Sequence, residues 1–184
     1  VRQVCGLCFC VSQAHAAFMA ESFEKSGIPA AYLTAKSDPE TRGQVRQQLV
    51  TRQINFLCVV DLYNEGVDLP ELDTVVFLRP TESLTVFLQQ LGRGLRLHDG
   101  KECLCVLDFV GRTHAQFNWE QRFRALLGRS SGRIEDEITG GFPYLPAGCS
   151  ITLERYARKY ILENIQHNIL HATRDRLVGR IRTF

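Results

Sequence analysis

The chain has 184 residues, enough for one domain with its own core and an additional segment. Its 45% hydrophobic and 23% charged residues are ordinary globular values, no apolar run reaches the length of a membrane span, and no signal-peptide pattern opens the sequence. These features exclude a membrane-embedded class, and we expect a cytoplasmic protein.

The distribution of charge and of apolar residues adds two expectations. The apolar run Val4–Val11 begins almost at the first residue, so we expect a piece of a longer chain. The net charge of +2 is uneven: residues 150–184 hold 7 Lys/Arg against 3 Asp/Glu, and residues 1–149 hold 15 against 17. A basic tail suits a polyanion or an acidic partner, and a solvated helical face explains it equally well.

Short apolar runs alternate with helical patterns over the first 130 residues. The runs are 4–11, 30–33, 54–60, 74–78 and 103–110, and the helical patterns lie near 13–26, 39–51, 83–91 and 113–128. Most runs are apolar on both alternations, as strands covered by helices on both faces are. The sequence therefore predicts an α/β fold, an open parallel sheet flanked by helices, with ligands bound at the carboxyl ends of the strands.

Most of the seven cysteines fall inside these apolar runs. Cys5-x-x-Cys8 has metal-ligand spacing, but no second pair follows at a zinc-ribbon interval. The alternating pairs Cys8/Cys10 and Cys103/Cys105 are typical of small buried strand residues. We therefore predict reduced structural thiols and no metal site.

The first loop after a predicted strand contains Ser12, Gln13 and His15. Ser12 suits the N-cap of a helix that Gly27 would end. A helix N-terminus with a hydroxyl can bind phosphate, and an ordinary cap with nothing bound explains the same residues. His15 fits a surface or capping role better than catalysis, because no nucleophile pattern accompanies it.

The second loop begins at Thr34. Ser37-x-x-Glu40 predicts a capping box at the start of the next helix. Arg42 and Arg46 then lie one helical turn apart on one face. They could contact backbone phosphates or only solvate the helix.

The third loop follows the apolar run that ends at Val60 and contains Asp61, Gly66, Asp68 and Pro70. Glycine allows a backbone to approach a ligand closely, and a neighbouring carboxylate can accept hydrogen bonds from ribose hydroxyls. Gly-x-Asp is also common turn chemistry, so the placement at a strand end is what makes this loop informative.

The run Gln89-x-x-Gly92-Arg93-x-x-Arg96 is the strongest candidate for chemistry. Guanidinium groups are planar, permanently charged and fork-shaped, so two of them beside an amide suit a phosphate whose charge grows during transfer. A solvated Arg/Gly turn is the alternative for the run taken alone.

The local structure of this run is predicted from its flanks. A helix capped by Thr81 or Ser83 should end near Leu91, where Gly92 and Gly94 would release the backbone from helical geometry. The two arginines could then point the same way.

The chain has no phosphate-binding loop of its own. The pattern Gly-x-x-x-x-Gly-Lys-Ser/Thr is absent, and Gly100-Lys101 is followed by Glu102. Asp108 at the end of an apolar run could be mistaken for a magnesium ligand, but no phosphate loop accompanies it. A nucleoside triphosphate would have to be held mainly by another domain.

Together these loops resemble the second RecA-like motor domain of superfamily 2 helicases and translocases, over roughly residues 3–128. Residues 9–15 look like the family's fourth motif, 61–70 like its fifth and 89–96 like its sixth. Residues 64–83 are similar to DEAD/DEAH-type helicases related to restriction-enzyme motor subunits.

The resemblance implies an ATP site shared with a first motor domain that this chain lacks. Arg93 and Arg96 would be arginine fingers on the γ-phosphate, and Gln89 would face that phosphate or the attacking water. The nucleotide would be lined by Gly66, Asp68 and Gly92. ATP and Mg²⁺ would be bound mainly by the first motor domain.

The resemblance also implies a nucleic-acid surface. Its residues would be Ser12, Gln13, His15, Thr34, Arg42, Val60 and Asp61. Many relatives have Thr where this chain has Val60, which puts one backbone contact in doubt. We favour DNA over RNA as the polymer, with the upstream RecA-like domain of the same polypeptide as a second partner and no membrane.

The predicted organisation is a motor domain over residues 1–128, a linker over 129–150 and a helical extension over 151–184 that begins a further domain or docks on the motor domain. Tyr156 and Tyr160 lie on the apolar stripe of that extension and should pack in a core.

The predicted function is that of an ATP-dependent helicase or translocase, of which this is the arginine-finger half, inactive alone. Two alternatives stay open. One is a non-catalytic nucleic-acid-binding or scaffolding domain that keeps the fold. The other is a different nucleotide-binding or nucleotide-sugar-binding α/β enzyme, in which Asp68 and Arg93 hold a diphosphate.

Overall fold

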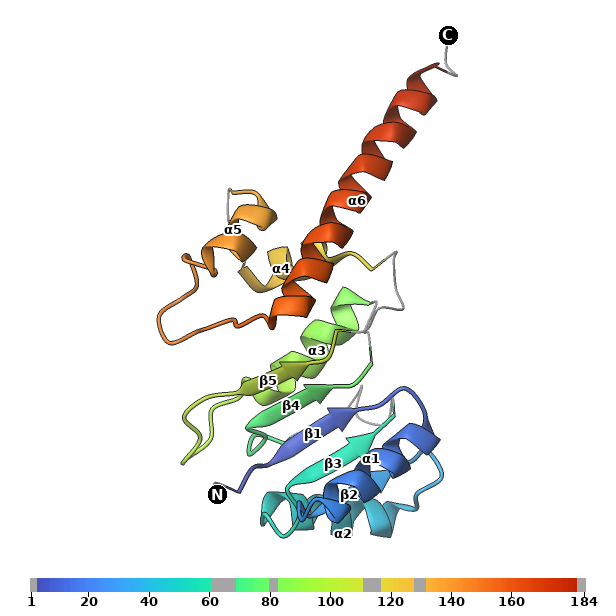
Figure 1. Ribbon diagram of the computed structural model, residues 1–184. Coiled ribbons are helices and arrows are strands. Elements are labelled where there is room, and N and C mark those ends of the chain that lie inside the picture. The colour runs from blue at the N-terminus through green and yellow to red at the C-terminus, as the bar shows by residue number, and fades with distance from the viewer. Residues whose placement is uncertain (1–2, 61–68, 80–82, 111–116, 128–131, 182–184) are drawn as a thin grey trace. The chain divides into compact units, whose positions relative to one another are not determined.

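The computed structural model describes residues 3–60, 69–79, 83–110, 117–127 and 132–181, without the side chains of Arg93 and of residues 170–181 (Figure 1). The chain divides into two compact units, Val1–Gly111 and Arg112–Phe184. Each unit is described by itself.

The first unit is built around a five-stranded parallel sheet. Its elements in chain order are β1 (Gly6–Phe9), α1 (Gln13–Lys25), β2 (Ala30–Leu33), α2 (Pro39–Val50), β3 (Phe56–Val59), β4 (Thr74–Phe77), α3 (Leu84–Gly94) and β5 (Cys105–Asp108). The strand order is β2-β3-β1-β4-β5, and every neighbouring pair is parallel. This sheet confirms the predicted fold class.

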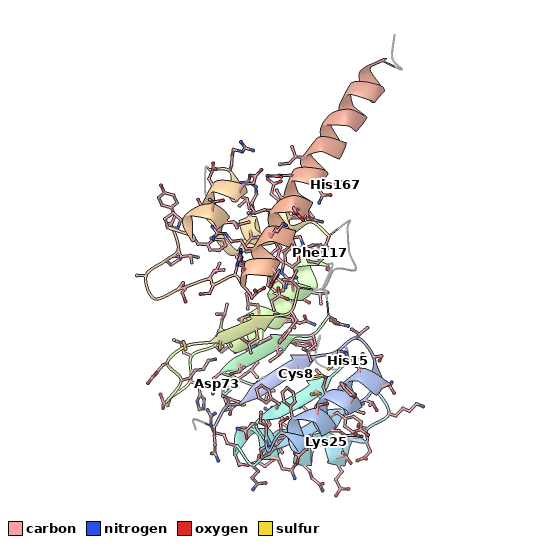
Figure 2. The ribbon with its side chains drawn as sticks, in the orientation of Figure 1. Cys8, His15, Lys25, Asp73, Phe117 and His167 are labelled. Carbon is pink, nitrogen blue, oxygen red and sulfur yellow. The ribbon has the colours of Figure 1, made fainter. Side chains whose placement is uncertain are left out.

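The helices of this unit cover both faces of the sheet. α1 packs against β2 and β3 on one face, and α2 and α3 lie on the other, as right-handed crossovers require (Figure 1). Since all strands run the same way, the sheet has a carboxyl edge, where every strand ends, and an amino edge, where every strand begins. Figure 2 shows His15 and Asp73 at these two opposite ends.

The face under α1 is packed with small residues. Cys8, Cys10 and Cys58 are fully buried and contact Ala16 and Ala20 of α1. Small side chains on both sides let the helix approach the sheet closely. The predicted burial of Cys8 and Cys10 is confirmed, with Cys8 in β1 and Cys10 just after its end.

The opposite face is packed by aromatic rings. Phe9 of β1 stacks on Phe77 of β4 with ring centroids 5.5 Å apart, and Phe87 of α3 lies 5.1 Å from Phe77. All three side chains are buried. Contacts of this kind contribute about 0.5–1.5 kcal/mol each beyond the area they bury, so they fix α3 on the sheet.

The edge strand β5 differs from its prediction. All four of its residues are exposed, and Cys103 and Cys105 are exposed thiols, so their predicted burial is wrong. The apolar pattern of 103–110 predicted a strand covered on both faces. Among the described residues, β5 is the edge strand of the sheet next to β4, and neither of its faces is buried.

The second unit contains α4 (Trp119–Leu127), α5 (Ile134–Gly140) and α6 (Arg155–Ile181). The division at Gly111 differs from the predicted motor-domain end at 128, and α5 lies inside the predicted linker. Ile134 and Ile138 explain this difference, because they give the Gly/Ser-rich segment two fully buried side chains.

The stripe predicted on the long C-terminal helix is confirmed in part. Ile161, Asn164 and Ile165 are buried, whereas Tyr156 is 78% exposed, so its predicted core position is wrong. At 3.6 residues per turn, Tyr156 lies about 140° around the helix from Ile161, which places it outside the buried face. Among the described residues, no helix combines the length and apolarity needed to cross a membrane.

Candidate functional site

The helix that carries the arginine run begins as predicted and ends later. Ser83 is the N-cap, and its Oγ accepts a hydrogen bond from the Val86 N–H at 3.3 Å. The helix then continues to Gly94, so the predicted end near Leu91 is wrong. Gly92 keeps helical geometry with open space around it, and glycine inside a helix costs only about 1 kcal/mol relative to alanine.

The length of α3 determines where the arginine run lies. The helix starts after β4 at the carboxyl edge, and its 11 residues span roughly 16 Å at 1.5 Å per residue. It therefore returns to the amino edge, where the chain turns toward β5. The expectation that ligand-binding residues gather at the carboxyl edge is wrong for this run. Gln89 and Arg96 are both exposed.

Lys101 lies at the amino edge beside the end of α3. Its Nζ donates hydrogen bonds to the carbonyl oxygens of Gly94 at 2.5 Å, Arg96 at 2.9 Å and Pro70 at 3.3 Å. Burial lowers the pKa of this half-buried amine, against the opposing charge of nearby Asp73. One ammonium group thus connects two segments that are distant in sequence.

The described residues on either side of the segment that resembles the fifth motif lie at opposite edges of the sheet. Val60 lies at the carboxyl edge, half-buried against the cluster of small residues under α1. Asp61, Gly66 and Asp68 lie outside the described residues. The chain is described again from Leu69 and Pro70, which precede β4 at the amino edge.

The first loop of the carboxyl edge is a helix cap. The Ser12 Oγ accepts the His15 N–H at 3.1 Å, and the His15 Nδ1 accepts the Val11 N–H at 3.3 Å. The predicted capping roles of Ser12 and His15 are confirmed. Gln13 is the exposed first residue of α1, and Gly27 follows the helix with φ +76°, as predicted for a stop.

The second loop is capped by a different residue from the one predicted. Asp38, not Ser37, is the N-cap of α2, with its carboxylate accepting the Thr41 N–H at 2.8 Å and the Thr41 hydroxyl at 2.7 Å. These bonds lower the pKa of Asp38 below its ordinary value. A carboxylate is favoured here by the helix dipole. Ser37 instead accepts the Thr34 N–H at 3.1 Å.

Arg42 stabilises this loop from within α2. Its Nη2 donates to the Ala35 carbonyl oxygen at 2.9 Å, and the side chain is only partly exposed. This bond adds a third possibility to the two predicted ones, since a loop-holding arginine shapes a surface without contacting phosphate itself. Thr34 belongs to the same network, because its Oγ1 accepts the Lys36 N–H at 3.2 Å.

Comparison with known proteins decides the family. The model of the helicase conserved C-terminal domain matches residues 2–98, more than half of the chain. The chain belongs to this helicase domain family. The match includes every residue predicted for the ATP site and the nucleic-acid surface, and it confirms the predicted second RecA-like motor domain.

Individual relatives of the helicase domain agree with this assignment. The putative ATP-dependent helicase IRC3 of Saccharomyces cerevisiae is 32% identical over 105 residues, covering 57% of this chain and 15% of the relative. The ATP-dependent DNA helicase Q-like 4B of Arabidopsis thaliana is 28% identical over 103 residues, covering 56% and 9%. The chain thus spans a small part of these relatives.

A solved structure supports the fold. The yeast DEAD-box splicing factor Prp28 superposes with a TM-score of 0.60 over 85% of this chain and 30% of that one, at 16% sequence identity. At such identity the likeness shows the fold alone, which is the RecA-like arrangement of the helicase domain.

Sequence reasoning missed two groups of residues in the helicase domain. Lys101 lies three positions beyond the matched part, and Gly100-Lys101 was considered only as a failed phosphate loop. Its signal is the turn: Gly100 has φ +79°, and the Lys101 N–H donates to the His98 carbonyl oxygen at 3.1 Å. No local pattern predicted the second group, which is formed by Arg52 and Asp73.

Arg52 and Asp73 connect three segments at the amino edge. The Arg52 Nη1 donates to Asp73 Oδ2 at 3.0 Å and to the Gln3 carbonyl oxygen. Asp73 Oδ1 accepts the Cys5 N–H at 3.1 Å and the Thr74 hydroxyl at 2.9 Å. The Asp73 carboxylate is therefore buried with both oxygens satisfied.

Proposed function

We propose that the chain is the second motor domain of an ATP-dependent nucleic-acid helicase or translocase. It would bring Arg93 and Arg96 to the γ-phosphate of ATP, which an upstream RecA-like domain of the same polypeptide holds with Mg²⁺. One observation carries this proposal: the complete Gln-x-x-Gly-Arg-x-x-Arg spacing lies within residues that match the helicase family, at the end of α3.

The position of this run at the amino edge supports a shared ATP site. Pro70 directly follows the predicted nucleotide-lining residues Gly66 and Asp68, and it is joined through Lys101 to the Arg96 backbone. Two guanidinium groups there would neutralise charge that develops on the transferred phosphate. A chain that supplies only these groups should hydrolyse no ATP alone.

The carboxyl edge is the proposed track for the nucleic-acid backbone. The loops of Ser12 and Thr34 lead into the N-termini of α1 and α2, whose N–H groups and dipoles favour phosphate. Gln13 and His15 extend this surface, and Arg42 would act by holding its loop in shape. We place DNA before RNA because the Arabidopsis relative is named a DNA helicase.

The test uses the full polypeptide that includes the upstream domain. Arg93→Ala and Arg96→Ala should each lower nucleic-acid-stimulated ATP hydrolysis by about a thousandfold, because an arginine finger contributes on that order to the rate. Affinity for nucleic acid should change little, since both residues lie away from the carboxyl edge.

A matched control is available on the second unit. Arg124 is a surface arginine paired with Glu120 at 2.8 Å, a contact worth roughly 0.3–0.5 kcal/mol, so Arg124→Ala should leave the rate near wild type. Full activity in both finger variants would reject the motor proposal. The alternative of a non-catalytic nucleic-acid-binding or scaffolding domain would then take its place.

A further inference from the structure

We infer that Lys101 is a positioning residue for Arg96, because its ammonium group joins the end of α3 to the segment that ends at Pro70. The inference rests on the proposed function and extends it beyond the matched helicase residues, which end at position 98. Lys101 is not proposed to touch ATP.

The number and chemistry of its contacts set Lys101 apart from a surface lysine. An ammonium group has three N–H donors and no acceptor. Three backbone carbonyl oxygens, those of Gly94, Arg96 and Pro70, lie within 2.5–3.3 Å of Nζ. The three N–H donors of Lys101 are thus matched by three acceptors. These acceptors are backbone atoms, so rotation of a side chain does not move them.

The Pro70 carbonyl is a fixed anchor for this arrangement. Leu69 is 2% exposed and Leu72 is fully buried, and the Leu72 N–H donates to the Leu69 carbonyl oxygen at 3.1 Å. Pro70 therefore sits in a turn held by two core side chains. Because Lys101 bonds the carbonyl oxygens of both Pro70 and Arg96, this turn restrains the position of the Arg96 backbone.

The end of α3 also lies against Leu104. A Cβ built on Gly94 would lie 2.4 Å from Leu104 Cδ1, so glycine lets the last helical turn contact that side chain directly. The turn at Gly100 in turn directs Lys101 back toward the helix. Arg96 follows the end of α3 by two residues, so these contacts restrain its backbone.

Restraint of the backbone matters because an arginine finger acts through its position. A misplacement of about 1 Å can cost a hundredfold in rate. Without the ammonium, the carbonyl oxygens of Gly94 and Arg96 lose their shared donor, and the residues after α3 gain freedom. The loss should appear in the catalytic step and not in the binding of ATP, which the upstream domain holds.

The experiment is a double-mutant cycle in the full polypeptide. Lys101→Met, which keeps an unbranched side chain only one atom shorter and removes the donors, should lower kcat for nucleic-acid-stimulated ATP hydrolysis roughly tenfold to a hundredfold. KM for ATP should stay within about twofold, since ground-state binding is not affected. In an Arg96→Ala background, Lys101→Met should lower kcat by less than about twofold, because residues that act through one another are not additive.

The control is Lys25→Met, which removes an exposed lysine paired with Glu21 and should leave kcat unchanged. A thermal melt of each variant reports folding. Should Lys101→Met fail to fold, Lys101→Leu, which also removes the donors, carries the same cycle with the same expected losses.

Two results would overturn the inference. One is an unchanged kcat in Lys101→Met, and the other is an equal loss of kcat with and without Arg96, which indicates a general structural effect. If Arg93→Ala and Arg96→Ala both retain full activity, the proposed function fails, and the inference that rests on it falls for that separate reason.

Discussion

Gly92 and Gly94 are the same residue type two positions apart in one helix, and their surroundings differ. A Cβ on Gly92 would meet nothing within 4 Å, whereas a Cβ on Gly94 would meet Leu104 at 2.4 Å and 2.8 Å. Only Gly94 is therefore required by packing. At Gly92 the absence of a side chain leaves open space beside Arg93, which suits the approach of a ligand to the backbone.

This difference predicts opposite effects of one substitution. Gly92→Ala should raise the free energy of unfolding of the chain by roughly 0.5–1 kcal/mol, since alanine is the better helix former. Gly94→Ala should lower it by about 1–3 kcal/mol, because Leu104 must move from its packed position. Urea unfolding followed by circular dichroism measures both, and a more stable Gly94→Ala variant would contradict the described packing.

The sheet itself is stabilised where its elements begin and end. Asp73 receives hydrogen bonds from the N-terminal segment at Cys5, from Arg52 after α2 and from Thr74 at the start of β4. One buried carboxylate therefore joins three elements that meet only in the fold. Arg52 is held with a φ of +59°, a left-handed conformation that is unusual for a residue with a side chain.

We predict that Asp73→Ala lowers the free energy of unfolding by about 2–4 kcal/mol. The substitution leaves the Cys5 N–H without its acceptor and removes the carboxylate that pairs with Arg52, whose guanidinium keeps its bond to the Gln3 carbonyl oxygen. An unsatisfied buried group costs about 1–3 kcal/mol, and the lost ion pair adds to that cost. Asp73→Asn should cost less, since it keeps one acceptor oxygen.

A surface pair provides the control for this prediction. Glu120→Ala removes the exposed partner of Arg124 and should change the free energy of unfolding by less than about 0.5 kcal/mol. Denaturant titration compares the three variants. An equal effect at Asp73 and Glu120 would contradict the assigned role of the buried carboxylate.

Local patterns predicted where the strands and helices of the first unit lie better than they predicted how these elements pack. The hydrophobic period gave the sheet and its helices, and Ser12, Ser83 and Gly27 were predicted correctly as cap or stop residues because their bonds are local. The end of α3 and the exposure of β5 could not be predicted this way. Both depend on the arrangement of the folded chain, such as the contact of Leu104 with Gly94 and the place of β5 at the edge of the described sheet.

The sequence predicted which residues form the candidate site, but it did not predict at which edge of the sheet they lie. The arginine run and the helix-capping loops were identified from spacing, and the rule that ligands bind at the carboxyl edge was applied to the strand-end loops in general. The return of α3 separates them, with Arg96 at the amino edge and Ser12 at the carboxyl edge. Lys101 escaped notice because the turn at Gly100 is its one local signal, and the carbonyl oxygens that it bonds come together only in the fold.

At the scale of the whole molecule, the proposed nucleic-acid contact predicts a dependence on salt. In the full polypeptide, raising monovalent salt from about 50 to 200 mM should weaken nucleic-acid binding at least tenfold, because counterions are released when phosphates are neutralised. Duplexes of unrelated sequence should bind alike. Fluorescence anisotropy measures the affinity, with DNA and RNA compared as competitors, and a salt-independent affinity would argue against a phosphate track.

The two edges are separated by paired strands, and the stiffness of that pairing determines how movement at one edge affects the other. The strands between Ser12 and Asp73 are hydrogen-bonded in one register, so the sheet behaves as a stiff strut about four residues long, or roughly 13 Å at 3.3 Å per residue. In the proposed motor, a displacement at the edge of Arg96 would reach the edge of Ser12 through paired strands, with no hinge among the described residues of β1 and β4.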